Sequence, residues 1–425
     1  VRFVANLPLA QFYHIAVDDE TPHHVMGGMQ DNGSWRGPSE VRREGGIRNH
    51  EWELVGFGDG YDVQPDPRDP ETGYAMWQGG NLLRWDVRSG ARRPIKPPQG
   101  DGPRLRFNWN TGLAIDPFEP GTIYYGSQFV HRSGDHGATW ETISPDLTTN
   151  KADWQRQDDS GGLTPDVTAA ENYCTILTIA PSPVARGVIW VGTDDGRIHV
   201  TRDGGATWTS VEGGLKGVPA NTWIPHIEAS RFDAGEAFVV LDDHRRSNWA
   251  PYVYKTTDYG KTWTSLVTPS LRGWALVVEQ DTVMRDLLFL GTEFGLYVSL
   301  DGGRRWLPFR HWVPTVSVMD LALQPRTGDL VIGTHGRSAL VIDDIAPLRE
   351  LSAAVMAKPV HLFPIAPALQ HLRPSEVSGF GLGHGEFRGE NRPYGAILTY
   401  SLHRADLPLP DADKEKERKE KERAA

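Results

Sequence analysis

Cysteine is almost absent from this sequence: Cys174 is the only one in 425 residues. A single cysteine excludes an intramolecular disulfide and any zinc site built on paired cysteines. Cys174 stands in the apolar stretch 174–179, where we expect a buried, unreactive thiol. Long apolar runs are also lacking, since none approaches the roughly 20 residues that a membrane-spanning helix needs. We therefore expect no membrane insertion.

Positive charge is scarce relative to negative charge. The sequence has 55 Asp and Glu against 44 Lys and Arg, a net charge of −11, so nucleic acids and anionic membranes are not expected as partners. It also lacks paired metal-binding histidines in a helical context, an EF-hand, a phosphate-binding glycine loop before a helix and a Gly-x-Ser-x-Gly elbow. These absences predict no metal site and no cofactor, and they give no support to serine-hydrolase chemistry.

Turn-forming residues and tryptophan are abundant instead, with 46 Gly, 31 Pro and 15 Trp. The pattern S/T-x-D-x-G-x-T-W occurs at 133–140, 201–208, 256–263 and 299–306, with Arg305 replacing the threonine of the last copy. Strand-like residues flank each copy. Asp accepts backbone N–H bonds, Gly tolerates positive φ, and Trp supplies a large apolar ring. We predict four hairpin turns with structural residues Asp135, Trp140, Asp203, Trp208, Asp258, Trp263, Asp301 and Trp306.

Each motif belongs to a unit that contains four short strands. Counting such units gives seven between residues 10 and 345, the first with a degenerate copy of the motif at 31–35. Four strands per unit are typical of a propeller blade. The predicted fold is all-β, a seven-bladed β-propeller with four-stranded blades, followed by an irregular C-terminal extension. The seventh unit has no evident fourth strand, and either 1–4 or 360–363 is expected to supply it.

The domain boundaries follow from these units. Residues 1–9 are expected to form an outer strand of a preceding or closing blade, 10–345 the propeller, and 346–410 an extension. The segment 411–425 is almost wholly charged and is expected to be a solvated helix or a disordered tail. Since the sequence begins with Val1 inside strand-like residues, we interpret it as a fragment of a longer protein.

The repeated motif is the Asp box, and its recurrence resembles the repeats of sialidases, sortilins and the two-propeller xyloglucanases. Five further stretches resemble a bacterial group related to sortilin whose members are often labelled glycosyl hydrolases: 30–38, 58–61, 107–110, 144–148 and 333–338. This resemblance implies a first propeller missing from this chain, a truncated β-sandwich beginning near 394–402, and a periplasmic or secreted location. It predicts the fold more strongly than a reaction, because enzymes and receptors share these repeats.

Propeller topology also predicts where a site would lie. The turns between second and third strands and the loops between blades open on one mouth of the central channel, and the Asp boxes lie at the opposite face. Carboxylates, amides and indoles on one rim would suit a sugar or an extended peptide. The catalytic candidates are Asp31, Asp194 and Glu293. The ligand-binding candidates are Asp59, Asn108, Trp109, Gln128, Asp195, Trp223, Asp243, His335 and Arg337.

Two functions remain open from the sequence. The first is a binding module for a peptide, protein or glycan, which we favour because no motif fixes a carboxylate pair. The alternative is a glycoside hydrolase with a carboxylate pair on the rim, one member having a raised pKa and Arg337 as counter-charge. Any single aspartate in these turns could equally have only a turn-forming role.

Overall fold

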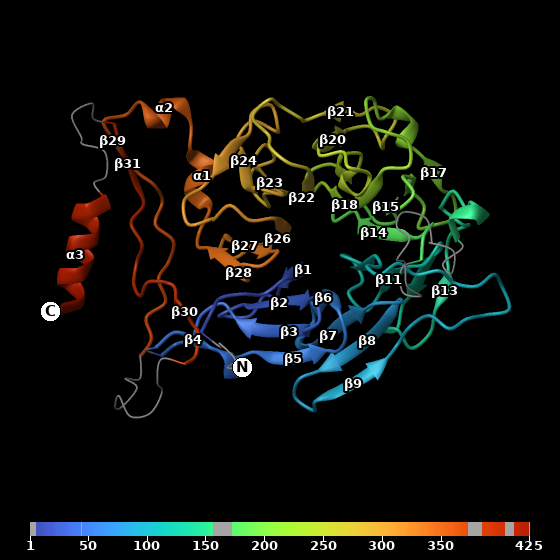
Figure 1. Ribbon diagram of the computed structural model, residues 1–425, viewed down its shortest axis with the longest axis horizontal. Coiled ribbons are helices and arrows are strands. Elements are labelled where there is room, and N and C mark those ends of the chain that lie inside the picture. Colours follow the sequence, from blue (N-terminus) through green and yellow to red (C-terminus); the bar gives the residue numbers. More distant parts are fainter. Residues whose placement is uncertain (1–5, 44, 156–171, 373–384, 404–411, 425) are drawn as a thin grey trace. The chain divides into compact units, whose positions relative to one another are not determined.

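The structure is a computed structural model that describes residues 6–43, 45–155, 172–372, 385–403 and 412–424. The chain divides into two compact units. The first comprises Val1–Ile345 with His371–Arg392, and the second comprises Ala346–Gln370 with Pro393–Ala425. The first unit is a seven-bladed β-propeller (Figure 1), so the fold predicted from the repeats is confirmed.

The first three blades are antiparallel sheets of four strands each. Blade 1 contains β1 (Phe12–Val17), β2 (His24–Met29), β3 (Gly33–Pro38) and β5 (Glu53–Gly56). Blade 2 contains β6 (Gly60–Asp66), β7 (Asp69–Trp77), β8 (Asn81–Asp86) and β9 (Ala91–Pro94). Blade 3 contains β10 (Leu113–Ile115), β11 (Ile123–Gly126), β12 (Val130–Ser133) and β13 (Glu141–Thr142).

The next three blades repeat this arrangement, and the described part of the seventh has three strands. Blade 4 contains β14 (Ile176–Pro181), β15 (Ile189–Thr193), β16 (Ile198–Thr201) and β17 (Thr209–Ser210). Blade 5 contains β18 (Trp223–Ala229), β19 (Ala237–Asp242), β20 (Tyr252–Thr256) and β21 (Thr264–Ser265). Blade 6 contains β22 (Ala275–Gln280), β23 (Leu288–Thr292), β24 (Gly295–Ser299) and β25 (Leu307–Phe309), and blade 7 contains β26 (Val318–Gln324), β27 (Asp329–Thr334) and β28 (Ala339–Ile342).

The hydrophobic core lies between neighbouring blades. The second strands β15, β19 and β23 are buried along their whole length, which explains their continuous apolar sequences, because both faces of these strands are covered. One cluster packs Trp190 and Ile198 of blade 4 against Ile224, Ile227 and Val239 of blade 5. The outer strands β17 and β21 are exposed. These blades are therefore buried at their inner strands and reach solvent at their outer strands.

The ring closes where blade 7 meets blade 1 (Figure 1). The carbonyl oxygen of Ala10 accepts hydrogen bonds from the N–H groups of Gly336 and Ser338, at 2.9 and 3.2 Å, and Gln11 forms an antiparallel bridge with His335. Of the two segments expected to complete blade 7, residues 1–4 lie outside the described residues. The other candidate, 360–363, is not its fourth strand: β29 (Val360–Leu362) pairs with β31 (Tyr400–Leu402).

The four repeated turns share one hydrogen-bond pattern. In the copy of blade 4, the Asp203 carboxylate accepts from the backbone N–H of Thr207 at 2.9 Å and from its hydroxyl at 2.6 Å. The hydroxyl of Thr201 donates to Asp203 at 2.8 Å. Gly205, at φ +104, packs against the carbonyl oxygen of Ile143 in blade 3, and a Cβ there would come within 2.7 Å of that atom. The turn itself therefore requires the aspartate and the glycine that all four copies share.

The tryptophan of each turn links two blades, which the sequence did not indicate. Each indole N–H donates to a backbone carbonyl just after the last strand of the preceding blade, at 2.8–3.0 Å. These bonds join Trp140 to Ile95, Trp208 to Ile143, Trp263 to Val211 and Trp306 to Leu266. The degenerate copy predicted at 31–35 is wrong: Asp31 and Trp35 belong to the β2–β3 turn and strand β3, not to a turn between third and fourth strands.

The second unit contains little regular structure in its described residues. It has the short helices α1 (Ala346–Glu350) and α2 (Ala353–Met356), the β29–β31 pair, and helix α3 (Ala412–Ala424). Helix α3 lies in the charged tail. Within the described residues, no helix is both long and apolar enough to cross a membrane. Strand β30 (Arg388–Gly389) belongs to the first unit and pairs with β4 (Ile47–Arg48).

Candidate functional site

The turns between second and third strands meet the loops between blades, as the topology requires. His335 of the β27–β28 turn donates its N–H to Ser317 at 2.9 Å, and Glu293 of the β23–β24 turn donates to Trp274 at 3.1 Å. The four repeated turns instead bond the loops between first and second strands, as in the 2.9 Å bond from Gly204 to Gly187. The two sets of turns therefore lie at opposite ends of the blades, and the first set surrounds one mouth of the channel.

Local β-bulges shape this mouth. Six of the innermost strands shift register within a few residues of their first residue, between residues 12/14, 60/63, 176/178, 223/226, 275/277 and 318/320. A bulge bends a strand and changes the direction of the side chains beside it. Six of the seven innermost strands are therefore irregular close to the point where the chain enters them.

Two carboxylates meet at blades 1 and 2. The backbone N–H of Asp31 donates to Asp59 Oδ1 at 2.7 Å, and the side-chain amide of Gln30 donates to both carboxylates, at 3.4 and 3.3 Å. Asp31 is exposed and Asp59 is buried. Burial raises the pKa of Asp59, and the neighbouring charge of Asp31 raises it further. This is the one candidate pair of rim carboxylates whose hydrogen bonds place them side by side.

Other candidates from the sequence are buried anchors. Asp194 is fully buried and accepts from the N–H of Thr175 at 2.8 Å, from its hydroxyl at 2.6 Å, and from the amide of Asn108 at 2.9 Å. Burial, together with the charge of Asp195, raises the pKa of Asp194 well above its usual range. Asp194 thus connects the β15–β16 turn to the loop that precedes blade 3. Neither oxygen of its carboxylate is open to a ligand.

Three further candidates have the same anchoring arrangement. Asp195 accepts from the N–H and the hydroxyl of Thr149, at 2.7 and 2.6 Å. Gln128, fully buried, accepts from the N–H of Arg106 at 2.9 Å and donates to Arg104 at 3.0 Å. Asp243 is buried and holds the loop after β19 through Arg246 and Asn248. These side chains support the mouth without facing it.

Aromatic side chains form the open part of the mouth at blades 5 and 6. The His244 ring stacks on Trp274 with a centroid separation of 4.6 Å and an interplanar angle of 17°, and Trp249 lies 5.3 Å from Trp274. The carboxylate of Asp242 orients His244 through a 2.7 Å contact. Trp249 is 56% exposed. The surface formed by His244, Trp249 and Trp274 is called the aromatic platform below.

Glu293 lies beside the aromatic platform. Its carboxylate forms no hydrogen bond or ion pair with any side chain in the described part of the chain, and the next residue, Phe294, is 51% exposed. Partial burial raises the pKa of Glu293, and nearby His244 opposes this effect. Of the three catalytic candidates, Glu293 is therefore an open carboxylate next to aromatic rings, whereas Asp194 is closed.

A second aromatic row contains Trp223. Its ring lies 6.2 Å from that of Tyr173, which lies 5.4 Å from Trp154. The guanidinium of Arg245 covers the Trp223 ring at 3.9 Å, and Lys151 covers Trp154 at 3.7 Å. Both ends of the row are therefore capped by cations, which leaves Trp223 less open than the aromatic platform.

The remaining candidates lie around blades 3 and 7. Trp109 is half-buried and packs against the cluster between blades 2 and 3. His335 contacts the side chain of Gln11 at 2.6 Å. Arg337 is exposed and lines a cavity beside β28. Within the described residues, no carboxylate forms an ion pair with Arg337, so its expected role as a counter-charge at the mouth stays a prediction.

The sequence reasoning missed a set of titratable side chains on the inner strands. His14 of β1 contacts Asp320 of β26 at 3.1 Å and Asn110 at 2.8 Å. Burial lowers the pKa of His14, but Asp320 outweighs this and raises it to about 9. Burial raises the pKa of Asp62 on β6 to about 6. Glu228 of β18 and Glu279 of β22 also have pKa values raised by burial and influenced by Asp320.

These side chains influence one another from five different blades, so they face the channel axis. A signal was present in the sequence: His14, Asp62, Glu228, Glu279 and Asp320 interrupt otherwise apolar inner strands. In the described part of the chain, no three His, Cys, Asp or Glu side chains form a group that could hold a metal ion. The channel wall thus carries titratable side chains whose pKa values are shifted by burial and by one another.

Comparison with known proteins gives a fold relationship. No protein-family model matches the chain, and no curated protein matches it. It is similar to the GH74 xyloglucanase from Xanthomonas campestris, with a TM-score of 0.58 and 18% identity, covering 83% of this chain and 54% of that enzyme. It is also similar to the GH74 enzyme of Niastella koreensis, with a TM-score of 0.51 and 17% identity, covering 81% and 53%.

The chain therefore spans about half the length of these two enzymes. At identities this low, the similarity shows the propeller fold alone.

Proposed function

We propose that this propeller binds a glycan chain at the mouth of its central channel. The observation that carries the proposal is the aromatic platform with an open carboxylate beside it. The apolar faces of pyranose rings pack on flat aromatic rings, and sugar hydroxyls donate to carboxylates. Trp249 supplies an exposed ring and Glu293 supplies the acceptor. One solved structure of similar fold is a xyloglucanase by its name, so a neutral glucan such as xyloglucan is the first ligand to test.

Kinship with Asp-box proteins such as sortilin is part of the same proposal. It is supported by the hydrogen bonds of the four repeated turns, for example those of Asp203 and Asp258. A peptide or protein ligand is the competing occupant of this mouth. The aromatic platform favours the glycan, because flat aromatic faces beside one carboxylate suit the stacking and hydrogen bonding of a pyranose ring. A partner propeller and an extracytoplasmic location remain proposals.

The binding proposal is tested by isothermal titration of xyloglucan oligosaccharides into the wild type and Trp249→Ala. Trp249→Ala should weaken binding by about tenfold, since it removes one stacking ring. Phe232→Ala is the matched control, because Phe232 is an exposed aromatic residue of the same blade in the β18–β19 turn at the opposite face. No binding by the wild type, or equal losses in both variants, would contradict the proposal. Peptide binding lost only in Trp249→Ala would replace the glycan by a peptide.

Hydrolysis is a second candidate function, and it depends on Asp31 and Asp59. Glycosidases use one carboxyl group kept protonated and one ionised. The raised pKa of Asp59 beside the exposed Asp31 has this asymmetry. An assay of reducing ends released from soluble glucans tests it. The wild type should show activity that Asp31→Asn and Asp59→Asn abolish while the fold is retained. If the wild type binds glycans but releases no reducing ends, the hydrolysis proposal is wrong and the binding proposal stands.

A further inference from the structure

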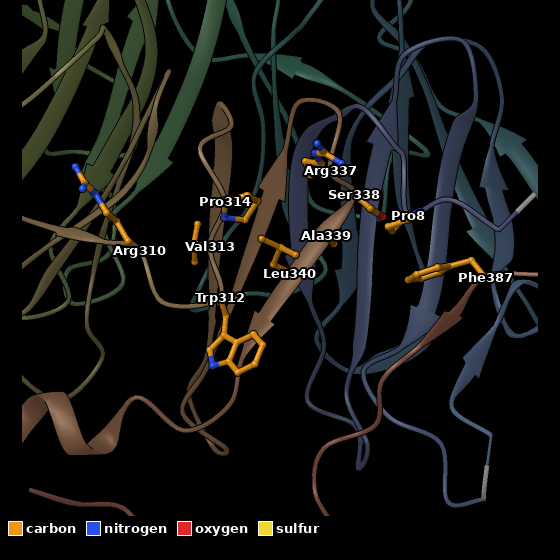
Figure 2. Close-up of a pocket in the computed structure, with 10 residues that line it drawn as sticks. All are labelled: Pro8, Arg310, Trp312, Val313, Pro314, Arg337, Ser338, Ala339, Leu340 and Phe387. Atoms are coloured by element: carbon orange, nitrogen blue, oxygen red, sulfur yellow. The ribbon is translucent and has the colours of Figure 1, made fainter. Parts of the chain in front are cut away.

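A second candidate binding site lies beside blade 7. It is a cavity of about 590 Å³ at the edge of β28. The wall comes from the loop between blades 6 and 7, from the β27–β28 turn and β28, and from two segments distant in sequence (Figure 2). The lining residues are Pro8, Arg310, Trp312, Val313, Pro314, Arg337, Ser338, Ala339, Leu340 and Phe387.

The charged side chains that line this cavity are all positive. Two arginines line it, and none of the lining residues is acidic. Neither guanidinium forms a hydrogen bond or ion pair with another side chain of the described residues, although the protein has a net charge of −11. Figure 2 shows Arg310 and Arg337 flanking Val313, Pro314 and Leu340. An uncompensated pair of arginines in a protein with excess acid selects an anionic ligand, and the planar guanidinium fits a carboxylate.

The aromatic component of the cavity is Trp312. It is 78% exposed, and its backbone has a φ of +63°, which is unfavourable for a bulky residue. The edge of its ring contacts His311 at a centroid distance of 5.1 Å and an interplanar angle of 76°. The strained backbone therefore holds a large indole face in the solvent at one side of the cavity. A backbone outlier of this kind is often associated with a binding role.

We propose that this cavity binds a uronic acid residue of an acidic polysaccharide. One sugar ring of such a chain offers its carboxylate to Arg310 or Arg337, and a further ring of the same chain offers an apolar C–H face to Trp312. The floor formed by Val313 and Leu340 excludes water from the contact and strengthens the ion pair. This site goes beyond the mouth site, since its lining includes neither Glu293 nor any residue of the aromatic platform.

The test uses the whole chain and oligogalacturonate as the probe, with its fully methyl-esterified form as the neutral counterpart. Titration at low ionic strength should show binding of the acid form and at least about tenfold weaker binding of the ester. Arg337→Gln, Arg310→Gln and Trp312→Ala should each weaken binding of the acid form by about tenfold. Arg304→Gln is the matched control, because Arg304 is exposed in the repeated turn of blade 6 and does not line the cavity; the affinity of this variant should be unchanged.

Any of the following three results would overturn the proposal. Absence of binding by the wild type removes the acidic sugar as ligand. Equal loss in Arg304→Gln and Arg337→Gln shows a general charge effect rather than this cavity. Equal affinity for poly-glutamate shows an acidic peptide as occupant. Trp249→Ala should bind oligogalacturonate as the wild type does, so that failure of the mouth site and failure of this site are distinguishable.

Discussion

The indole N–H of Trp306 in blade 6 donates a 2.9 Å hydrogen bond to the carbonyl oxygen of Leu266, just after the outer strand of blade 5. The indole is buried, with 2% of the residue exposed. The same bond recurs between three other pairs of blades. A motif that is local in sequence therefore stabilises the packing of one blade on the next.

Replacing Trp306 by Phe should lower the free energy of unfolding by about 2 kcal/mol. The change removes the hydrogen bond to Leu266 and leaves a small cavity in a buried position. Urea unfolding followed by circular dichroism measures this. Trp249→Phe is the control, because Trp249 is exposed and should change stability by less than about 0.5 kcal/mol. Equal effects of the two changes would show that the bond between blades contributes nothing specific.

The turn aspartates predict a stability loss in acid. Hydrogen bonds from the hydroxyl and N–H of Thr207 lower the pKa of Asp203 to about 2, against about 3.9 in an unfolded chain. A depressed folded pKa gives stability that is present above about pH 4 and is lost as the pH falls through about 2. Melting temperatures measured from pH 5 to 2 should fall less steeply in Asp203→Asn than in the wild type. Parallel curves would contradict this contribution.

The ion pair that closes the ring predicts the opposite dependence at alkaline pH. Asp320 raises the pKa of His14 to about 9, above the unfolded value of about 6.5. A raised folded pKa gives stability that is fully present below about pH 6.5 and is lost as the pH rises through 9. The melting temperature of the wild type should fall over that range, and that of His14→Gln should fall less. An imidazole resonance of His14 that titrates near 6.5 by NMR would refute the assignment.

Replacing Asp194 by Asn tests whether its carboxylate anchors the surrounding loops or takes part in catalysis. The amide would place a donor against the N–H and hydroxyl of Thr175, which now donate to the carboxylate. We expect a loss of about 1–3 kcal/mol in unfolding free energy and unchanged ligand affinity at temperatures where the variant is folded. Asp101→Asn, the same change at an exposed position, serves as the control. Full stability combined with lost activity would return Asp194 to the catalytic candidates.

Some features of this protein could be predicted from the sequence because they depend on short-range interactions. In the turn of Asp203, the carboxylate binds residues two and four positions away, so the turn chemistry is contained in eight residues. The repetition of such turns with apolar strands between them implied seven blades. The location of Asp31 and Glu293 in turns between second and third strands followed from the same strand order.

The accessibility of each candidate was decided only by the tertiary structure. Asp194 and Glu293 lie in equivalent turns. Asn108, 86 residues away in sequence, covers the carboxylate of Asp194. The carboxylate of Glu293 instead lies uncovered beside the aromatic platform. The contact between His14 and Asp320 spans 306 positions and exists only because the ring closes. Burial and long-range pairing set which carboxylate is charged, covered or free to bind, and neither is contained in the local pattern of residues.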